Sequence, residues 1–146
     1  TSNMCTAQVL LAVIAGMYAT YYGPQGLKSI AQRVRQMALG LRDHVAKLGY
    51  TVNSKDIFDT VSFSVTDAQM ADIKKFSQEK QVNFFYPNAK TVQISIDETV
   101  TEEDLATVLS VLNRGMKLTP NLGKSASTKL ERTSAYLEHP VFNRYH

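Results

Sequence analysis

Residues 7–48 follow a helical pattern that is interrupted once, by the dipeptide Gly23-Pro24. Before it, residues 7–22 are apolar or small at nearly every position, which predicts a helix covered on several sides. After it, apolar residues recur at spacings of three and four up to Leu48, which predicts a long amphipathic helix that ends at Gly49. Glycine tolerates the left-handed cap and proline suits the first helical position, so we expect one helix to stop here and a second to begin.

The middle of the chain carries strand patterns. Residues 60–65 alternate strictly, with Val61, Phe63 and Val65 on one face and hydroxyl side chains on the other. Residues 82–86 and 91–96 predict a hairpin joined by a turn at Pro87-Asn88, and residues 50–52 begin extended structure.

Two further helices have start signals. Thr66 with Gln69 matches a capping box before a helix carrying Met70, Ile73 and Phe76 on one side. Thr101 caps a last helix with an acidic first turn, a stripe of Leu105, Val108, Leu109 and Leu112, and an end at Gly115. The predicted fold class is α+β, an antiparallel sheet with helices on one face, preceded by long helices. Thr119-Pro120 and the polar run from Asn121 to Thr133 lose periodicity, which indicates a connector that lies over a surface or is disordered when that surface is missing.

Composition narrows the possible functions. The formal charge of +3 arises without a dense basic run, which argues against nucleic-acid binding. The longest apolar stretch, residues 7–19, is shorter than the roughly 20 residues of a membrane span, so we expect no membrane partner. The lone Cys5 excludes an internal disulfide and favours an intracellular protein.

Few residues suggest chemistry directly. His44, His139 and His146 lack neighbours at metal-ligand spacing, and no serine-hydrolase, phosphate-loop or dinucleotide signature is present. We interpret Asp97-Glu98 as the end of a strand, because adjacent side chains of an extended chain point in opposite directions. The tyrosines at 18, 21 and 22 are interpreted as packing residues.

Two candidate sites lie at the start of the chain. Cys5, in or before the first helical turn, is a possible redox residue or a buried small side chain. Thr1, Ser2 and Asn3 could bind an anion next to a helix start or simply cap that helix.

Several strings resemble the P-protein of the glycine cleavage system: residues 1–8, residues 23–28, Ser95-Ile96-Asp97-Glu98-Thr99 and the terminal HPVFNRYH. Both end octets run on without a natural boundary, so we interpret the chain as a fragment from the later part of the amino-terminal half. The resemblance implies a fold-type-I pyridoxal phosphate enzyme with two similar halves. Residues 1–49 would be long helices joining the large and small domains, residues 50–116 the small α+β domain, and residues 117–146 the connector toward the next half.

The same resemblance implies the parent's activity: decarboxylation of glycine on pyridoxal phosphate and transfer of the aminomethyl group to the lipoyl H-protein. The family's imine-forming lysine sits in a glycine-rich stretch of the other half, so this fragment is expected to be a non-catalytic scaffold without covalent cofactor. Its partner would be the carboxy-terminal half, in a bacterial cytoplasm or, in a eukaryote, a mitochondrion. By analogy with fold-type-I enzymes, Thr1, Ser2 and Asn3 would contact the cofactor phosphate of the partner half.

One departure and two alternatives accompany this interpretation. Within Asn83–Tyr86 a phenylalanine stands where relatives often carry an arginine, which removes a bidentate carboxylate ligand.

A free-standing α+β ligand-binding or regulatory domain is the first alternative, and a compact carboxy terminus would favour it. An RNA-binding sheet stacking bases on Phe84, Phe85 and Tyr86 is the second. The fragment interpretation predicts an exposed apolar surface on residues 7–22.

Overall fold

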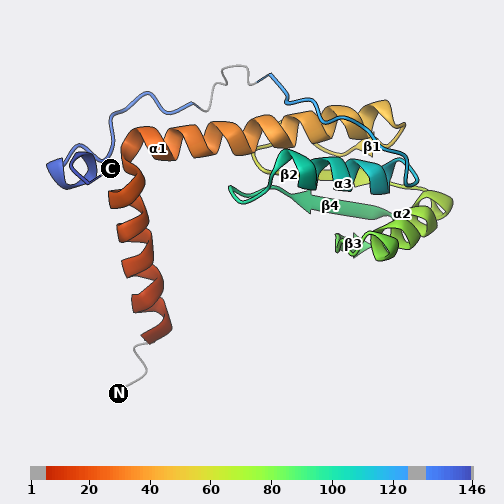
Figure 1. Cartoon of the computed structure of the whole chain (residues 1–146), viewed down its shortest axis with the longest axis horizontal. Helices are drawn as coiled ribbons and strands as arrows, with labels where there is room; N and C mark the ends of the chain where they lie inside the picture. The colour runs from red at the N-terminus through yellow and green to blue at the C-terminus, as the bar shows by residue number, and fades with distance from the viewer. Residues whose placement is uncertain (1–5, 125–130, 146) are drawn as a thin grey trace. The chain divides into compact units, whose positions relative to one another are not determined.

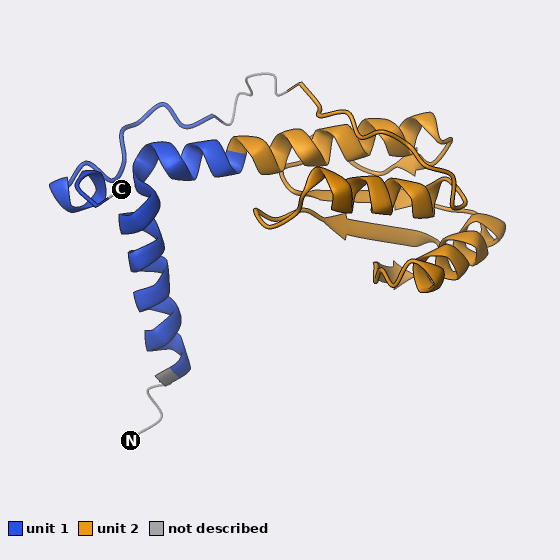
Figure 2. Ribbon diagram, viewed as in Figure 1, with its two compact units in different colours: residues 1–31, 127–146 blue, residues 32–126 orange. Residues whose placement is uncertain are grey.

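The computed structural model describes residues 6–124 and 131–145. It divides into two compact units, one formed by residues 1–31 and 127–146 and the other by residues 32–126 (Figure 2). We call them unit 1 and unit 2. The element order is α1, β1, β2, α2, β3, β4, α3 and a short 3-10 helix, η1 (Figure 1).

Helix α1 runs from Thr6 to Lys47 and is two helices joined at Gly23. Gly23 has φ 60° and ψ −179°, which breaks the helical geometry, and Pro24 starts the second segment. Because φ is positive there, the position favours glycine. The predicted stop and restart are therefore confirmed, and the chain bends at this point (Figure 1).

Unit 2 contains a four-stranded antiparallel sheet in the order β1-β2-β4-β3. The strands are β1 Thr51–Val52, β2 Thr60–Ser64, β3 Phe85–Asn88 and β4 Thr91–Ser95. The register pairs Val61 with Ile94 and Phe63 with Val92, so these buried side chains share one face. The residues between them along β2 and β4 are half-buried or exposed.

The hairpin is confirmed, but two details of its prediction were wrong. Strand β3 begins at Phe85 rather than Val82, and it includes Pro87 and Asn88, which had been assigned to the turn. Ala89 and Lys90 form the turn instead, and the Lys90 amide donates to Asn88 Oδ1 at 2.8 Å. Proline is tolerated because β3 is an edge strand, where its missing amide interrupts no ladder.

Two helices complete unit 2, α2 Asp67–Glu79 and α3 Glu102–Leu112. The predicted capping box at α2 is confirmed: the Thr66 amide donates to Gln69 Oε1 at 2.8 Å, and the Gln69 amide donates to Thr66 Oγ1 at 3.3 Å. Thr101 caps α3 as predicted and forms a second box with Asp104. Helix α3 ends at Leu112, three residues before Gly115, which lies in the following turn with φ 82°.

The core of unit 2 combines the apolar face of the sheet with residues of all three helices. Helix α2 packs against α3. The largest fully buried side chains are Phe63, Met37, Leu41, Ile73, Leu105, Leu109, Val45, Val61, Val92 and Val111. The fold class is thus α+β, with an antiparallel sheet whose apolar face is covered.

The segment after α3 crosses the second half of α1. The Gly123 amide donates to the Gln36 carbonyl oxygen at 2.9 Å. A Cβ built at Gly40 would overlap the Asn121 carbonyl oxygen, and one built at Gly123 would overlap Leu39. Two glycines therefore permit residues 121–123 to approach the backbone of α1 closely.

Candidate functional site

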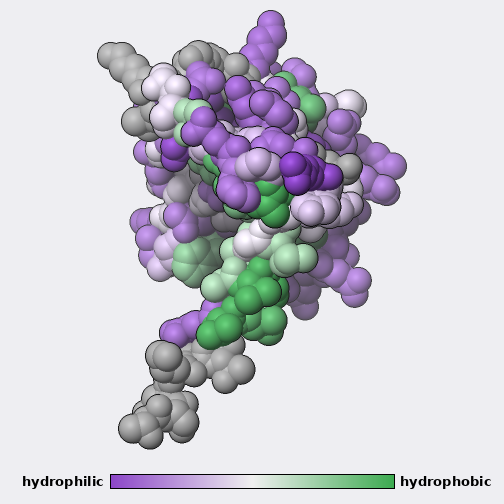
Figure 3. Space-filling model, turned by 90° about the vertical axis from the view of Figure 1, so that its left-hand side faces the viewer, coloured by the Kyte–Doolittle hydropathy of each residue, from purple (hydrophilic) through white to green (hydrophobic). Residues whose placement is uncertain are grey.

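Residues 7–22 of α1, which we call the apolar segment, expose most of their large side chains. Met17 is 65% exposed, whereas Met37 in the second half of the same helix is 1% exposed. Figure 3 shows the apolar side chains gathered along this segment. The other exposed large apolar residues of the segment are Val9, Leu10, Leu11, Val13, Ile14, Tyr21 and Tyr22. The exposed apolar surface predicted for a fragment is confirmed.

Three tyrosines form one end of this surface. The rings of Tyr18 and Tyr22 have centroids 4.6 Å apart, and those of Tyr21 and Tyr22 are 5.0 Å apart at 89°. With Val13, Ile14 and Met17 they line a shallow hollow of about 380 Å³. No charged side chain lines it, so its chemistry favours another apolar surface over a polar ligand.

Unit 1 also holds a contact between its two ends. The Tyr136 hydroxyl donates to the Pro24 carbonyl oxygen at 2.6 Å, and the Arg132 guanidinium lies 5.5 Å from the Tyr136 ring centroid. Residues 140–143 form η1, whose start is capped by His139: its Nδ1 accepts from the Val141 amide at 3.2 Å. His139 is therefore a capping residue here.

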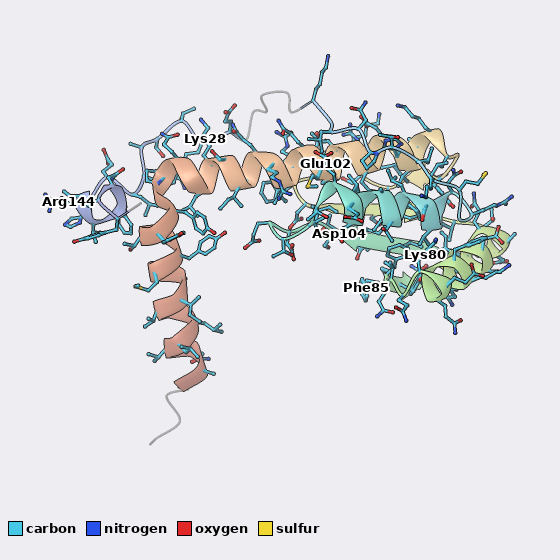
Figure 4. The ribbon with its side chains drawn as sticks, in the orientation of Figure 1. Lys28, Lys80, Phe85, Glu102, Asp104 and Arg144 are labelled. Atoms are coloured by element: carbon cyan, nitrogen blue, oxygen red, sulfur yellow. The ribbon has the colours of Figure 1, made fainter. Side chains whose placement is uncertain are left out.

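The second hollow lies in unit 2, beside the end of β4 and the first turns of α3, and measures about 320 Å³. Figure 4 labels Phe85 on β3 and Asp104 on α3, which both line it. Sequence reasoning missed this hollow, because it depends on where the β3–β4 ladder stops.

Asp97 and Glu98 have the structural role predicted for them. The Asp97 carboxylate accepts from the Thr99 hydroxyl at 2.6 Å and from its amide at 2.8 Å, and these bonds lower the pKa of Asp97. Arg33 donates to the carbonyl oxygens of Glu98 at 3.0 Å and Val100 at 2.6 Å. The loop before α3 is thereby attached to α1 within unit 2.

The candidate residues Thr1, Ser2, Asn3 and Cys5 lie outside the described residues.

Burial is the main cause that lowers the pKa of His44, whose Nε2 is shielded from solvent without a hydrogen-bond partner. Within residues 6–124 and 131–145, no cluster of three metal-ligating side chains occurs. In the same ranges, no helix combines the length and apolar character needed to cross a bilayer.

Neither hollow offers a primary amine. The lysines that the structure describes are all exposed, and the lining of both hollows contains no lysine or arginine. The described lysines are Lys28, Lys47, Lys55, Lys74, Lys75, Lys80, Lys90, Lys117 and Lys124. An imine-forming cofactor with a phosphate group needs a sheltered amine and anion ligands, so neither hollow fits such a cofactor.

Comparison with known families agrees with the sequence motifs. The profile of the glycine cleavage system P-protein matches residues 1–112, and the chain belongs to this family. Three relatives named glycine dehydrogenase (decarboxylating) match the whole chain. They come from Paraburkholderia phytofirmans, Flavobacterium johnsoniae and a Nostoc species, with identities of 43%, 40% and 41% over 159, 158 and 157 residues. The chain spans 16% of the length of each of these relatives.

Proposed function

We propose that this chain works as a non-catalytic scaffold and interface portion of a glycine dehydrogenase (decarboxylating). The observation that carries the proposal is the exposure of the apolar segment: Leu11 and Met17 are each 65% exposed. An apolar surface of this kind marks an interaction site in a soluble protein. The remainder of the P-protein is the natural partner, because the relatives are about six times longer than this chain.

The activity of the parent follows from the family resemblance. The parent would decarboxylate glycine on pyridoxal phosphate, which acts as electron sink, and pass the aminomethyl group to the lipoyl H-protein. The exposure of the described lysines supports a scaffold role in this portion. The covalent cofactor site would then lie in the carboxy-terminal half, either in the same chain or in a second subunit.

The proposed place in the parent is the small domain of a fold-type-I transferase, residues 50–116, with residues 1–49 as its connecting helices and residues 117–146 leading to the next half. Unit 2 supports this in part, since residues 50–116 lie inside one compact unit. That unit also includes α1 from Gln32 onward, because Met37, Leu41 and Val45 are buried in its core. The relatives compared are bacterial, and we place the parent in a bacterial cytoplasm.

The alternatives receive less support. A regulatory ligand-binding domain would need a hollow with several convergent polar groups, and the linings of both hollows are mainly apolar. An RNA platform made of Phe84, Phe85 and Tyr86 would need these rings to be exposed for stacking on bases. Phe85 is exposed, but Phe84 and Tyr86 are half-buried, and the Lys74 ammonium lies 5.5 Å from the Tyr86 ring centroid.

The proposal is tested by Ile14→Asp in the full-length P-protein. A carboxylate on a buried apolar surface costs several kcal/mol, so we expect a lower unfolding temperature and at least a roughly tenfold loss of glycine-dependent CO2 release. Gln25→Asp, at an exposed polar position of the same helix, is the matched control and should behave as wild type. Wild-type stability and activity of Ile14→Asp would contradict the proposal.

The roles proposed for the first residues need a separate experiment. Replacing Thr1 and Ser2 by alanine in the full-length enzyme should weaken pyridoxal phosphate affinity if these residues, with Asn3, contact its phosphate. Unchanged affinity would remove that assignment. For Cys5, labelling by a thiol reagent at neutral pH that is no faster than in an unfolded control would exclude a reactive thiol.

A further inference from the structure

The sheet of unit 2 is incomplete at the end of β4. Strand β3 pairs with β4 at Phe85–Gln93 and Asn88–Thr91, with a bulge between these pairs. Residues 82–84, which would continue the ladder, are not part of β3. The last residue of β4, Ser95, therefore has a neighbouring strand on one side only.

The register shows where the main-chain groups of Ser95 point. The Ile96 amide donates to the Asp59 carbonyl oxygen at 3.0 Å, which makes Ile96 and Asp59 a hydrogen-bonded pair between β4 and the start of β2. In an antiparallel ladder, successive residues direct their main-chain groups to opposite neighbours. The amide and carbonyl of Ser95 thus point away from β2, and no backbone group among the described residues pairs with them.

These unpaired groups face the second hollow. Its volume is about 320 Å³, and Ser95 is an exposed residue of its lining. The walls are mainly apolar, and Phe85, 65% exposed, stands at its edge. The full lining is Val82, Asn83, Phe84, Phe85, Gln93, Ile94, Ser95, Ile96, Val100, Asp104, Leu105 and Val108. An amide and a carbonyl beside apolar walls suit an added extended strand.

The acidic end of this hollow adds a charge preference. Asp104 lines it, and Figure 4 labels Asp104 together with the nearby Glu102. Both Glu102 and Glu103 are exposed. The Asp104 carboxylate accepts from the Thr101 hydroxyl at 2.7 Å and from its amide at 2.9 Å, so its position is fixed. A basic side chain is the complementary partner for such a position.

We propose that this hollow binds an extended segment of the P-protein from outside these 146 residues, which pairs with the main chain of Ser95. The segment places an apolar side chain against Val108 and a lysine or arginine near Asp104. This inference rests on the proposed function, which makes the rest of the P-protein the partner. A segment in the same assembly has a high effective concentration at the hollow, and the matched relatives extend far beyond the 16% that this chain spans.

The experiment is hydrogen exchange of the Ser95 amide, measured in the full-length P-protein and in the 146-residue chain. We expect exchange at least roughly tenfold slower in the full-length protein, because a paired amide is protected. Val108→Arg in the full-length protein should remove this protection. Val52→Arg is the matched control, since Val52 is half-buried in the edge strand on the other side of the sheet, and it should leave Ser95 protected.

Phe85→Arg is a second variant that disturbs the fold less, because Phe85 is mostly exposed; it should also remove the protection. Equal exchange of Ser95 in both proteins would overturn the inference. Protection that rises with the concentration of the 146-residue chain would assign the hollow to a second copy, and protection that needs added H-protein would assign it to that partner; either result also overturns it. If Met17 is shielded in the full-length protein while Ser95 exchanges freely, this inference fails and the proposed function stands.

Discussion

Apolar side chains are buried in the second half of helix α1 and exposed in the first half. In the second half, Met37, Leu41 and Val45 are fully buried within unit 2. In the first half, Val13, Ile14 and Met17 are more than half exposed in unit 1. Burial of apolar surface stabilises a fold by about 25 cal/mol per Å². The exposed side chains of the first half do not make this contribution in unit 1.

The difference lies in what each unit supplies for its own helices. Unit 2 provides a sheet with one apolar face, capping boxes at Thr66 and Thr101, and a connector that crosses α1 at Gly40. The described residues of unit 1 contain no strand, and the large side chains of the apolar segment are mostly exposed. Apolar composition alone therefore does not make a core, and we propose that the remainder of the P-protein covers this segment.

The largest contrast should come from two phenylalanines of unit 2. Phe63→Ala removes a fully buried ring and should lower the free energy of unfolding by about 3–5 kcal/mol. Phe85→Ala, at a 65% exposed position, should change it by about 0.5 kcal/mol or less. Chemical denaturation of both variants measures the difference. If both variants lost a similar amount of unfolding free energy, Phe63 would not be a core residue of unit 2.

Two glycines of α1 give the next contrast. Gly40→Ala should cost about 1–3 kcal/mol, because the new Cβ overlaps the Asn121 carbonyl oxygen and displaces the connector. Limited proteolysis within residues 117–124 should become faster.

Gly16→Ala is the matched control in the 146-residue chain. Nothing lies within 4 Å of its new Cβ, so higher helix propensity should stabilise that helix by up to about 1 kcal/mol. A destabilising effect there would mean that the apolar segment is already packed in this chain.

Tyr50 joins the sheet to the end of α3. Its hydroxyl donates to the Leu112 carbonyl oxygen at 2.7 Å, and Tyr50→Phe should cost about 1 kcal/mol. Burial is the main cause that raises the pKa of Tyr50 above its usual value. Since the folded pKa is the higher one, this stability is present below the unfolded pKa of about 10 and is lost as the pH rises through the folded pKa.

The measurement for Tyr50 is unfolding by urea at pH 8 and at pH values above 10. Wild type and Tyr50→Phe should differ at pH 8 and converge at the higher pH. A constant difference across this range would show that the hydroxyl does not titrate with folding.

The smallest effect is expected for His44. Burial lowers the pKa of this imidazole. Its contribution to stability is therefore present above the unfolded pKa of about 6.5 and lost as the pH falls through the lower folded pKa. His44→Gln should flatten the decline in stability between neutral and mildly acidic pH. An unchanged slope in His44→Gln would contradict this.

Much of unit 2 could be predicted from local patterns. The alternation at Val61, Phe63 and Val65 identified the buried face, and Thr66 with Gln69 identified a helix start. The capping box of Thr101 with Asp104 was missed, because its pattern usually carries a longer glutamate or glutamine. Strand alternation and helix caps depend on residues a few positions apart, so they can be predicted from local sequence patterns.

The features that depend on distant residues could not be predicted. The β3–β4 ladder stops at Phe85, and nothing in the alternation of residues 82–86 marks that end. The crossing of Gly40 by residues 121–123 joins positions about eighty residues apart. The hollow beside Ser95 follows from both the ladder and the position of α3, and so it was found only in the structure.

The central claim is that the apolar segment is covered in the full-length P-protein, and oxidation of Met17 by peroxide tests it most directly. In the 146-residue chain, Met17 should oxidise fast and Met37, which is 1% exposed, slowly. In the full-length protein we predict that Met17 becomes roughly tenfold slower and approaches Met37. Equally fast oxidation of Met17 in both proteins would contradict the claim.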